Sequence, residues 1–372
     1  MKSIDLFAGC GGLSLGMKQA GIEIVLASDF KDYAGETYQN FFNQDFIVED
    51  ILSIEQNNWA KFNGFQNKVH IIAGGPPCQG FSYANRQRVK DDPRNKLYKS
   101  FLGCINFIKP DIVLMENVRG IKNIATHIVK EFHDIGYIGE FFQLNAKDFG
   151  IPQNRERVFF LLFNEQRFDQ TDKRLLKFME LLEEKKSKSD PVVLKNALYG
   201  LPKLKAKTKK NSTTFESKEN GLYEIKSNKS NNYLELINGF KKGKIFNHMA
   251  RYNNPRDIEI FSLLPQGENS LHESIRHLMP YKTRDHIFKD KYFKLDENKV
   301  CKTITAHMSF DCNMYIHPTQ ARGLTPREAA RVQSFPDNFE FMGSYTKWYE
   351  QIGNAVPPIL AKSIGEAILE VS

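Results

Sequence analysis

The stretch Asp5–Gly16, with the sequence DLFAGCGGLSLG, decides the fold of this chain. It ends a short apolar strand, passes through a glycine-rich turn and begins a helix. Glycines in such a turn let the backbone approach a ligand closely. The pattern is typical of nucleotide-cofactor sites, and a tight turn that binds nothing would also produce it. Asp29 ends the next predicted strand, where an acid can hold the ribose hydroxyls of a cofactor.

Strand and helix patterns alternate on either side of this stretch. The predicted strands are 3–7, 23–28, 69–73, 111–115 and 157–163, and the predicted helices are 13–20, 33–42, 97–108 and 124–135. This alternation predicts an α/β fold in which helices cover both faces of a parallel sheet. Ligands bind such sheets at the carboxyl ends of the strands.

The composition of the 372 residues excludes several classes of protein. Hydrophobic residues make up 41%, which is enough to build a core and excludes wholesale disorder. The longest apolar run, 158–163, is far shorter than the roughly 20 residues of a membrane helix, and the N-terminus lacks a signal-peptide pattern. Five cysteines without a CxxC pair argue against a disulfide framework and a metal site. We therefore expect a soluble cytoplasmic protein with about two domains.

Positive charge is concentrated in one region. The chain carries a net charge of +8, yet residues 185–244 alone carry +10, from 15 lysines and five acidic residues. Such a region indicates a polyanionic partner, most simply a nucleic acid. A solvated lysine-rich surface explains the charge equally well. Regular periodicity also weakens after about residue 184, which predicts a second, irregular domain.

Two further motifs place reactive groups at the ligand edge of the predicted sheet. The sequence GGPPCQGFS, residues 74–82, follows a strand and holds Cys78 between prolines and glycines, as a nucleophile would be held. Glu116 follows the neighbouring strand 111–115. A cysteine facing a carboxyl group suggests covalent catalysis assisted by an acid. The alternatives are a buried inert cysteine and a solvated glutamate.

Six sequence blocks together resemble the ordered motifs of the C5-cytosine DNA methyltransferases. They are DLFAGCGGLSLG, GGPPCQGFS, ENV at 116–118, QNRERVFFL at 153–161, LTPREAARVQSFPD at 324–337 and QIGNAVPP at 351–358. The resemblance covers most of 1–163 and 324–372. The interval 164–323 then corresponds to the family's variable target-recognition region, and it contains the lysine-rich region.

The resemblance implies a Rossmann-like domain that uses S-adenosylmethionine, with no metal. Cys78 matches the nucleophile that adds to C6 of cytosine, and Glu116 matches the acid at N3 and the exocyclic amine. Arg155 and Arg157 match the basic pair that braces this site. A base inside a duplex cannot be attacked in place, so the target cytosine must be flipped out of the helix.

The resemblance also implies the residues that bind the cofactor. They are Phe7, Gly9, Gly11, Asp29, Phe30, Asp50, Ile51, Pro77, Leu97, Asn354 and Val356. The chain departs from the usual family pattern at Asp29, which is often Glu, and at Phe30, which is often Trp. Because the last motif returns to the cofactor site, we predict a catalytic domain of 1–185 plus 345–372 and a target-recognition domain of 186–344.

Contacts with DNA are predicted from the same motifs and from the lysine-rich region. The predicted DNA-binding residues are Gln79, Ser82, Thr303, Ile304, Lys203, Lys205, Lys207 and Arg251, with His248 and Tyr252 as further candidates for contact with bases. Lysines bind phosphates and give affinity rather than sequence preference. Arg327 and Arg331 lie on one face of a predicted helix at 325–333, and a scaffold role is expected for both.

The resulting hypothesis is a DNA cytosine-C5 methyltransferase of a restriction–modification system. Double-stranded DNA is its predicted partner, and a restriction endonuclease would act on the same site without a stable complex. We expect a monomer that is nucleoid-associated through DNA. One alternative is an RNA cytosine-C5 methyltransferase, although the Cys-Phe-Thr tripeptide of that branch does not occur. The other is a silent DNA-binding protein, which would be expected to lack Cys78 or Glu116.

Overall fold

The computed structural model describes residues 1–77, 95–186, 191–210, 221–224, 230–239, 243–279 and 291–372. The chain divides into two compact units. Unit 1 comprises Met1–Phe149, Arg155–Lys188 and Val356–Ser372, and unit 2 comprises Gly150–Asn154 and Ser189–Ala355. The domain bounds drawn from the sequence stay a prediction, because compactness alone does not establish which parts fold independently.

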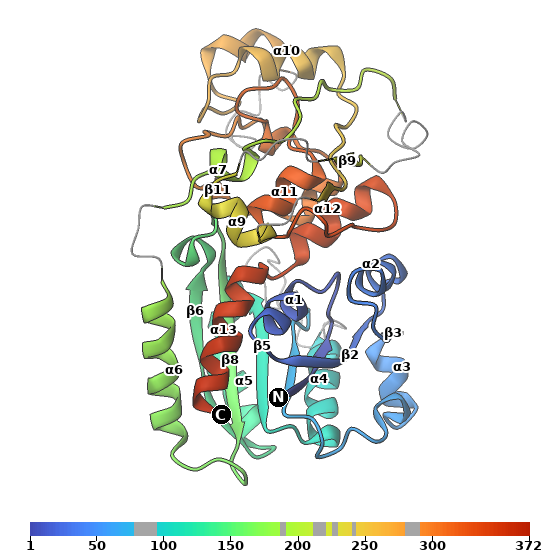
Figure 1. The fold of residues 1–372 in the computed structure, drawn as a ribbon, viewed down its shortest axis with the longest axis vertical. Helices are drawn as coiled ribbons and strands as arrows, with labels where there is room; N and C mark the ends of the chain where they lie inside the picture. Colours follow the sequence, from blue (N-terminus) through green and yellow to red (C-terminus); the bar gives the residue numbers. More distant parts are fainter. Residues whose placement is uncertain (78–94, 187–190, 211–220, 225–229, 240–242, 280–290) are drawn as a thin grey trace. The chain divides into compact units, whose positions relative to one another are not determined.

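Unit 1 is built on a seven-stranded sheet with the order β3-β2-β1-β4-β5-β8-β6 (Figure 1). Its strands are β1 (Lys2–Leu6), β2 (Glu23–Asp29), β3 (Phe46–Val48), β4 (Ile71–Gly74), β5 (Ile112–Val118), β6 (Tyr137–Asn145) and β8 (Glu156–Asn164). The first five are parallel, whereas β8 is antiparallel to both β5 and β6. The α/β class is therefore confirmed, and the expectation of a wholly parallel sheet is wrong.

The antiparallel strand has a physical cause in the connection that precedes it. Between β6 and β8 the chain forms only a short 3-10 turn, η4 (Ala146–Phe149), and the two-residue strand β7 (Gln153–Asn154). A parallel neighbour requires a crossover of a dozen or more residues, usually containing a helix. This connection is too short for one, so β8 returns beside β6 as an antiparallel partner.

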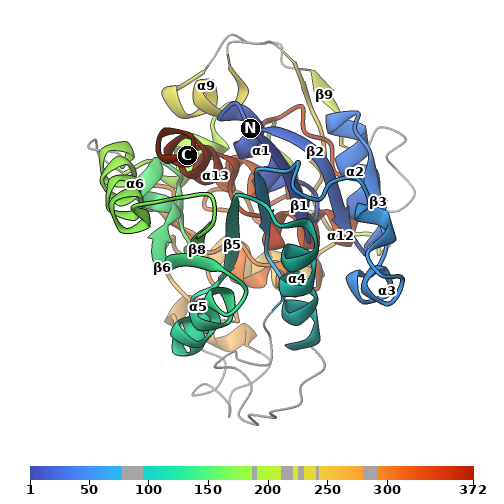
Figure 2. The same cartoon turned by 90° about the horizontal axis from the view of Figure 1, so that it is seen from below.

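Helices cover both faces of this sheet. They are α1 (Gly12–Gln19), α2 (Asp32–Phe42), α3 (Ile51–Gln56), α4 (Asn95–Ile108), α5 (Ala125–His133), α6 (Thr171–Lys185) and α13 (Pro358–Val371), with 3-10 turns η1 (Ala60–Phe62) and η3 (Arg119–Ile124). In Figure 2, α1, α6 and α13 lie on one face and α4 and α5 on the other. A Cβ atom added at Gly16 would lie 2.3 Å from Pro358 O, so this glycine allows α13 to pack directly on α1. The C-terminal helix is thus part of the same unit as the first strand.

Unit 2 has little regular structure. Its described elements are β7, α7 (Leu194–Leu198), β9 (Tyr223–Glu224), α9 (Asn232–Asn238), β10 (Lys244–Ile245), α10 (Pro255–Leu263), η5 (Glu273–Leu278), β11 (Cys301–Lys302), η6 (Ala306–Ser309), η7 (Asn313–Tyr315), α11 (Pro326–Val332) and α12 (Tyr345–Asn354). The predicted start of α11 is confirmed: Thr325 caps the helix and forms a capping box with Glu328. A small apolar cluster around Phe261, Tyr292 and Ile316 packs under α10. Within the described part of the chain, no helix is long and apolar enough to cross a membrane.

Candidate active site

The centre of the candidate site is an ion pair between two neighbouring strands of unit 1. Glu116 lies on β5, and Arg157 lies on the antiparallel strand β8, where it pairs with Val118. Arg157 Nε is 2.9 Å from Glu116 Oε1, and both side chains are largely buried. Burial raises the pKa of Glu116, although the charges of Arg157 and Arg155 oppose that shift. Glu116 therefore keeps a proton at higher pH than an exposed glutamate does.

The backbone that leads to Cys78 passes directly beside this carboxyl group. A Cβ atom at Gly75 would lie 3.1 Å from Glu116 Oε2, so the close approach depends on glycine. Asn117 Nδ2 donates a 2.8 Å hydrogen bond to Pro76 O. The ENV motif thus contacts the GGPPC motif at Gly75 and Pro76, within the part of that motif that the structure describes, which ends at Pro77. Cys78, Gln79 and Ser82 lie outside the described residues, and their predicted roles stay predictions.

Arg155 completes the group of side chains around Glu116. It is almost fully buried, and its backbone N–H donates to Asn145 Oδ1 at 3.1 Å. Its carbonyl accepts a hydrogen bond from the backbone N–H of Ala146, the first residue of η4. The structure therefore brings Glu116, Arg155 and Arg157 together at one edge of the sheet, as the sequence predicted. Their predicted chemical roles are not tested by this arrangement.

The glycine-rich turn after β1 is organised by Asp29 at the end of β2. Its carboxylate accepts hydrogen bonds from Gly9 N and Lys31 N, each 3.0 Å long. Gly9 has a φ of 54°, and a Cβ added there would meet nothing within 4 Å. Gly11 has a φ of 91°, and a Cβ there would lie 2.6 Å from the Phe42 ring. Gly9 therefore leaves open space for a ligand, whereas Gly11 is required by packing.

The other predicted cofactor residues divide by exposure. Phe30 is 62% exposed, so its ring is free to cover a ligand. Asp50 caps α3 by accepting from Leu52 N at 3.0 Å. The remaining candidates are Phe7, Pro77 and Leu97, which are partly buried, Ile51 and Val356, which are buried, and Asn354, which is exposed and belongs to unit 2. An open turn, an acid and an exposed ring fit the adenosine part of S-adenosylmethionine.

Burial disqualifies the other cysteines as nucleophiles. Cys10, Cys104, Cys301 and Cys312 are all buried thiols. Burial raises the pKa of Cys10 and of Cys301 to about 12, and it also raises the pKa of the other two thiols. A thiol becomes a nucleophile only as its thiolate, so these four are inert near neutral pH.

In unit 2 the two arginines of α11 have the predicted scaffold role. Arg331 forms a two-point ion pair with Asp337, with both N···O distances at 2.7 Å, and it also donates to the carbonyl groups of Ala197 and Tyr199. Arg327 donates to three backbone carbonyl groups, including Pro336 O at 2.7 Å. Both side chains are buried, and their donors are used inside the protein.

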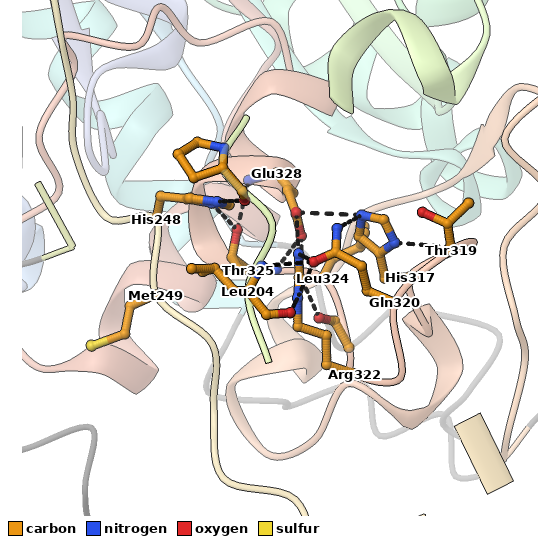
Figure 3. Close-up of polar contacts among 12 residues, drawn as sticks. Leu204, His248, Met249, His317, Thr319, Gln320, Arg322, Leu324, Thr325 and Glu328 are labelled. Atoms are coloured by element: carbon orange, nitrogen blue, oxygen red, sulfur yellow. Dashed lines mark hydrogen bonds and ion pairs between the residues drawn. The ribbon is translucent and has the colours of Figure 1, made fainter. Parts of the chain in front are cut away.

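A second buried network lies at the start of α11 (Figure 3). Arg322 donates to both carboxylate oxygens of Glu328, at 2.7 and 2.6 Å, and His317 Nε2 is 3.5 Å from Glu328 Oε1. His248 contacts Thr325 Oγ1 and Pro202 O through its two ring nitrogens. The prediction that His248 reaches DNA bases is wrong, because this ring is fully buried and both nitrogens are engaged.

The remaining predicted DNA contacts differ in how accessible they are. Lys203 and Lys205 are exposed, and Lys207 is partly buried. The Thr303 hydroxyl donates to Asn154 O at 2.7 Å, and Ile304 is fully buried, which favours a packing role for its side chain. Arg251 is partly buried and donates to the backbone of residues 308 and 310. Tyr252 forms an isolated bridge with Lys207.

Two residues that organise these sites were not singled out from the sequence. Asn117 anchors the Pro76 carbonyl, as described above. Gln153 accepts from Ile304 N at 2.8 Å and donates to Gln333 Oε1 at 2.7 Å. Both lie inside the quoted motifs, directly beside or close to charged residues that drew attention instead. Their signal is position within the motif, because an amide side chain alone does not indicate a partner.

Comparisons with known proteins agree on one family. The model of the C-5 cytosine-specific DNA methylase family matches residues 1–370. The type II methyltransferase M.DdeI of Desulfomicrobium norvegicum is 35% identical over 99% of this chain and 88% of its own. The type II methyltransferase M1.HphI of Haemophilus parahaemolyticus is 31% identical over 99% and 87%. A solved structure of a prophage-encoded E. coli protein, described as a DNA modification methyltransferase, has a TM-score of 0.76 at 28% identity and covers 100% of this chain and 99% of its own.

Proposed function

The chain belongs to the C-5 cytosine-specific DNA methylase family, and from this premise we propose that it methylates C5 of a flipped-out cytosine within a specific sequence of duplex DNA. The observation that carries the detailed proposal is the buried pair of Glu116 and Arg157 beside the backbone that leads to Cys78. The pair supplies an acid with a raised pKa at the edge of the sheet. The nucleophile would be Cys78, which follows Gly75 by three residues.

The proposed chemistry begins with covalent catalysis, because cytosine C5 is a weak nucleophile. The thiolate of Cys78 adds to C6 and forms a carbon–sulfur bond. The electron pair of the C5–C6 double bond then forms a double bond between C4 and C5. The double bond between N3 and C4 opens, its electron pair moves to N3, and N3 takes a proton from Glu116. The ring is now an enamine that is nucleophilic at C5.

The second half of the reaction restores the aromatic ring. After C5 has gained its methyl group, N3 returns its proton to Glu116. A base removes the C5 proton, the C5–C6 double bond forms again, and Cys78 leaves as thiolate. Arg155 and Arg157 hold Glu116 in place through charge, and Arg157 also does so through a hydrogen bond. The inert state of the four buried cysteines supports Cys78 as the nucleophile.

S-adenosylmethionine would supply the methyl group in this proposal, and S-adenosylhomocysteine would be the product that leaves. Asp29 would hold the ribose, and Phe30 would cover the adenine. The open backbone at Gly9 supports close approach of the ligand. The other residues proposed to hold it are Phe7, Gly11, Asp50, Ile51, Pro77, Leu97, Asn354 and Val356. No metal is needed for this chemistry.

The proposed partner is double-stranded DNA. The exposed Lys203 and Lys205, together with Lys207, would bind phosphates. Gln79, Ser82, Thr303 and Ile304 are proposed as further residues of the DNA-binding surface. The type II names of the relatives support a role in restriction–modification, in which methylation protects host DNA from an endonuclease that acts on the same sequence. We propose that the enzyme acts as a cytoplasmic monomer on the nucleoid, without a stable complex with that endonuclease.

Bisulfite sequencing of plasmid DNA from cells that express the chain tests this function. We expect protected cytosines within one short sequence, and no protection in cells that express Cys78→Ala. The variant should still bind duplex DNA, which separates loss of chemistry from loss of fold. Protection by Cys78→Ala would reject the nucleophile. If soluble wild-type protein leaves all cytosines unprotected, the DNA methyltransferase proposal fails, and methyl transfer to RNA is the next assay.

A further inference from the structure

Arg251 links two separate segments of unit 2. Its backbone carbonyl accepts a hydrogen bond from Lys207 N at 3.1 Å. Its guanidinium donates to Met308 O and Phe310 O, both at 3.0 Å, and contacts Cys312 Sγ at 3.5 Å. One residue therefore joins the end of a lysine-rich segment, defined here as residues 203–210, to the loop 306–312. We call these the basic segment and the Arg251 loop.

The Arg251 loop is held in one conformation by further contacts. Met308 N donates to Thr305 O at 3.2 Å, and Phe310 N donates to His307 O at 2.9 Å. The Met308 side chain is fully buried. A Cβ atom at Gly353 would lie 2.1 Å from Ala306 N, so the loop packs directly on the backbone of α12. Because these contacts hold the loop backbone in place, a side chain that the loop exposes stays exposed.

Phe310 is nevertheless the most exposed large hydrophobic side chain among the residues that the structure describes, at 76%. Its ring lies 5.4 Å from the ring of His307, which is also exposed. A single exposed apolar residue is common on protein surfaces and by itself indicates nothing. Here the loop that carries the ring is held in place and is linked through Arg251 to the segment that carries exposed lysines. The exposed ring therefore belongs to a surface that also offers positive charge.

The basic segment is fixed as well. Leu204 N donates to Gln320 Oε1 at 2.8 Å, and Pro202 O lies 2.8 Å from His248 Nε2. Gln320 and His248 belong to the buried network of Figure 3, so this network holds the segment from beneath. Lys203 and Lys205 are exposed on either side of Leu204. Both ammonium groups are therefore open to solvent and accessible to a polyanionic partner.

From this arrangement we infer that the Arg251 loop contacts the bases of duplex DNA through Phe310 while the basic segment binds the phosphates. The inference rests on the proposed function and names the surface that reads the DNA. Aromatic side chains contact thymine methyl groups, and apolar side chains wedge between base steps. Arg251 is a positioning residue in this account, because its donors are used to shape the loop.

Phe310→Ala tests the base contact, with Leu176→Ala as the matched control. Leu176 is 66% exposed on α6 of unit 1, so both variants remove an exposed apolar side chain. Bisulfite sequencing of wild-type-modified DNA first defines the methylated sequence. Two duplexes are then compared, one with this sequence and one with the flanking bases scrambled.

We expect Phe310→Ala to lower kcat/KM on the first duplex about tenfold or more, which is the scale of one lost base contact. Affinity for the scrambled duplex and its dependence on salt should stay as in wild type, since the lysines remain. If Phe310→Ala has the wild-type kcat/KM, the inference is overturned and the proposed function stays intact. The same conclusion follows if the variant loses affinity equally for both duplexes. If the wild-type protein methylates no duplex, the proposed function fails and the inference fails with it.

Arg251→Lys tests positioning against direct contact with phosphate. Lysine keeps the charge but lacks the forked donors that reach two carbonyl groups. A positioning role predicts the same selective loss of kcat/KM as in Phe310→Ala, with an unchanged salt dependence. If Arg251→Lys has wild-type kcat/KM, the positioning role is rejected. If Arg251→Gln lowers the salt dependence while Arg251→Lys restores it, Arg251 binds phosphate instead.

Discussion

At the scale of single residues, the proposed chemistry depends on a carboxyl group that burial keeps protonated more readily than usual. Burial raises the pKa of Glu116, and the positive charges of Arg157 and Arg155 limit that rise. The same arginines keep the group in place. A buried carboxyl without such partners would be costly and free to turn away from the reacting ring. In the proposed mechanism the pairing would thus give the proton donor a fixed position.

Glu116→Gln is expected to slow methyl transfer by roughly two to four powers of ten, because the amide cannot deliver a proton to N3. Formation of the covalent adduct, trapped on a duplex that contains 5-fluorocytosine, should slow to the same extent. Binding of S-adenosylmethionine, measured by calorimetry, should stay close to wild type. Glu140→Gln, at an exposed position of β6, is the control. Adduct formation at the wild-type rate in Glu116→Gln would remove this residue from the acid role.

Asp5 gives a second prediction at this scale, concerning stability. Its Oδ2 accepts from Ser14 Oγ at 2.5 Å, while Oδ1 has no hydrogen-bond partner among the described residues. Burial raises the pKa of Asp5 to about 7. An unfolded aspartate has a pKa of about 3.9, so between these values the folded state binds a proton that the unfolded state has lost. The free energy of unfolding therefore falls as pH rises through this window.

Asp5→Asn should remove that fall, because the amide is neutral at every pH. We expect the variant to gain a few kcal/mol over wild type on going from about pH 4 to about pH 8. Urea unfolding at both pH values measures the difference. Asp32→Asn, at an exposed position of α2, should keep the wild-type pH dependence. The same fall in Asp5→Asn as in wild type would show that the carboxyl group is ionised in the folded protein.

At the scale of elements, the sequence predicted the strands, turns and helices whose formation depends on the local residue pattern. The strand–turn–helix at Asp5–Gly16 and the capped start of α11 were found because their glycines, proline and capping residues act locally. β6 and α6 were missed. Alternation in β6 is interrupted by glycine, and α6 is exposed along much of its surface, so its apolar pattern is weak. The direction of β8 was also missed, because it follows from the length of the connection.

In the candidate site, too, features set by local motifs were predicted and features set by distant contacts were not. Glu116, Arg155 and Arg157 were found through motifs, and the structure brings them together. The role of Arg251 was not predictable, since its partners are backbone carbonyl groups nearly 60 residues away. The spacing of residues in the sequence does not indicate which side chain will bind a backbone carbonyl group far away in the chain. Exposure of Phe310 was hidden for the same reason, because the loop that holds it is fixed by contacts remote in sequence.

At the scale of the whole molecule, the two units are stabilised differently. The sheet of unit 1 packs on a large apolar core formed by its strands and by α4 and α5. The apolar cluster under α10 in unit 2 is small, and buried ion pairs lie around α11. Removing one partner of a buried pair leaves an uncompensated charge and costs more than the pair itself contributes. Unit 2 should therefore be sensitive to the loss of a single partner from these buried pairs.

Glu328→Gln is the sharpest test of this difference. Although burial alone would raise the pKa of Glu328, pairing with Arg322 holds it below its usual range, so the carboxylate is charged at neutral pH. The substitution leaves the buried Arg322 without a counter-charge, and we expect unit 2 to lose about 3–5 kcal/mol of stability. Hydrogen exchange read by mass spectrometry should show faster exchange across unit 2 only.

Glu268→Gln is the matched control, because Glu268 is an exposed glutamate of the same unit. It should leave exchange unchanged in both units. The depressed pKa also fixes the sign of the acid response: the stability from Glu328 is present above the unfolded pKa of about 4.3 and is lost as pH falls through the folded value. Faster exchange spread equally over both units in Glu328→Gln would contradict the division, because the two parts would then unfold together as one cooperative body.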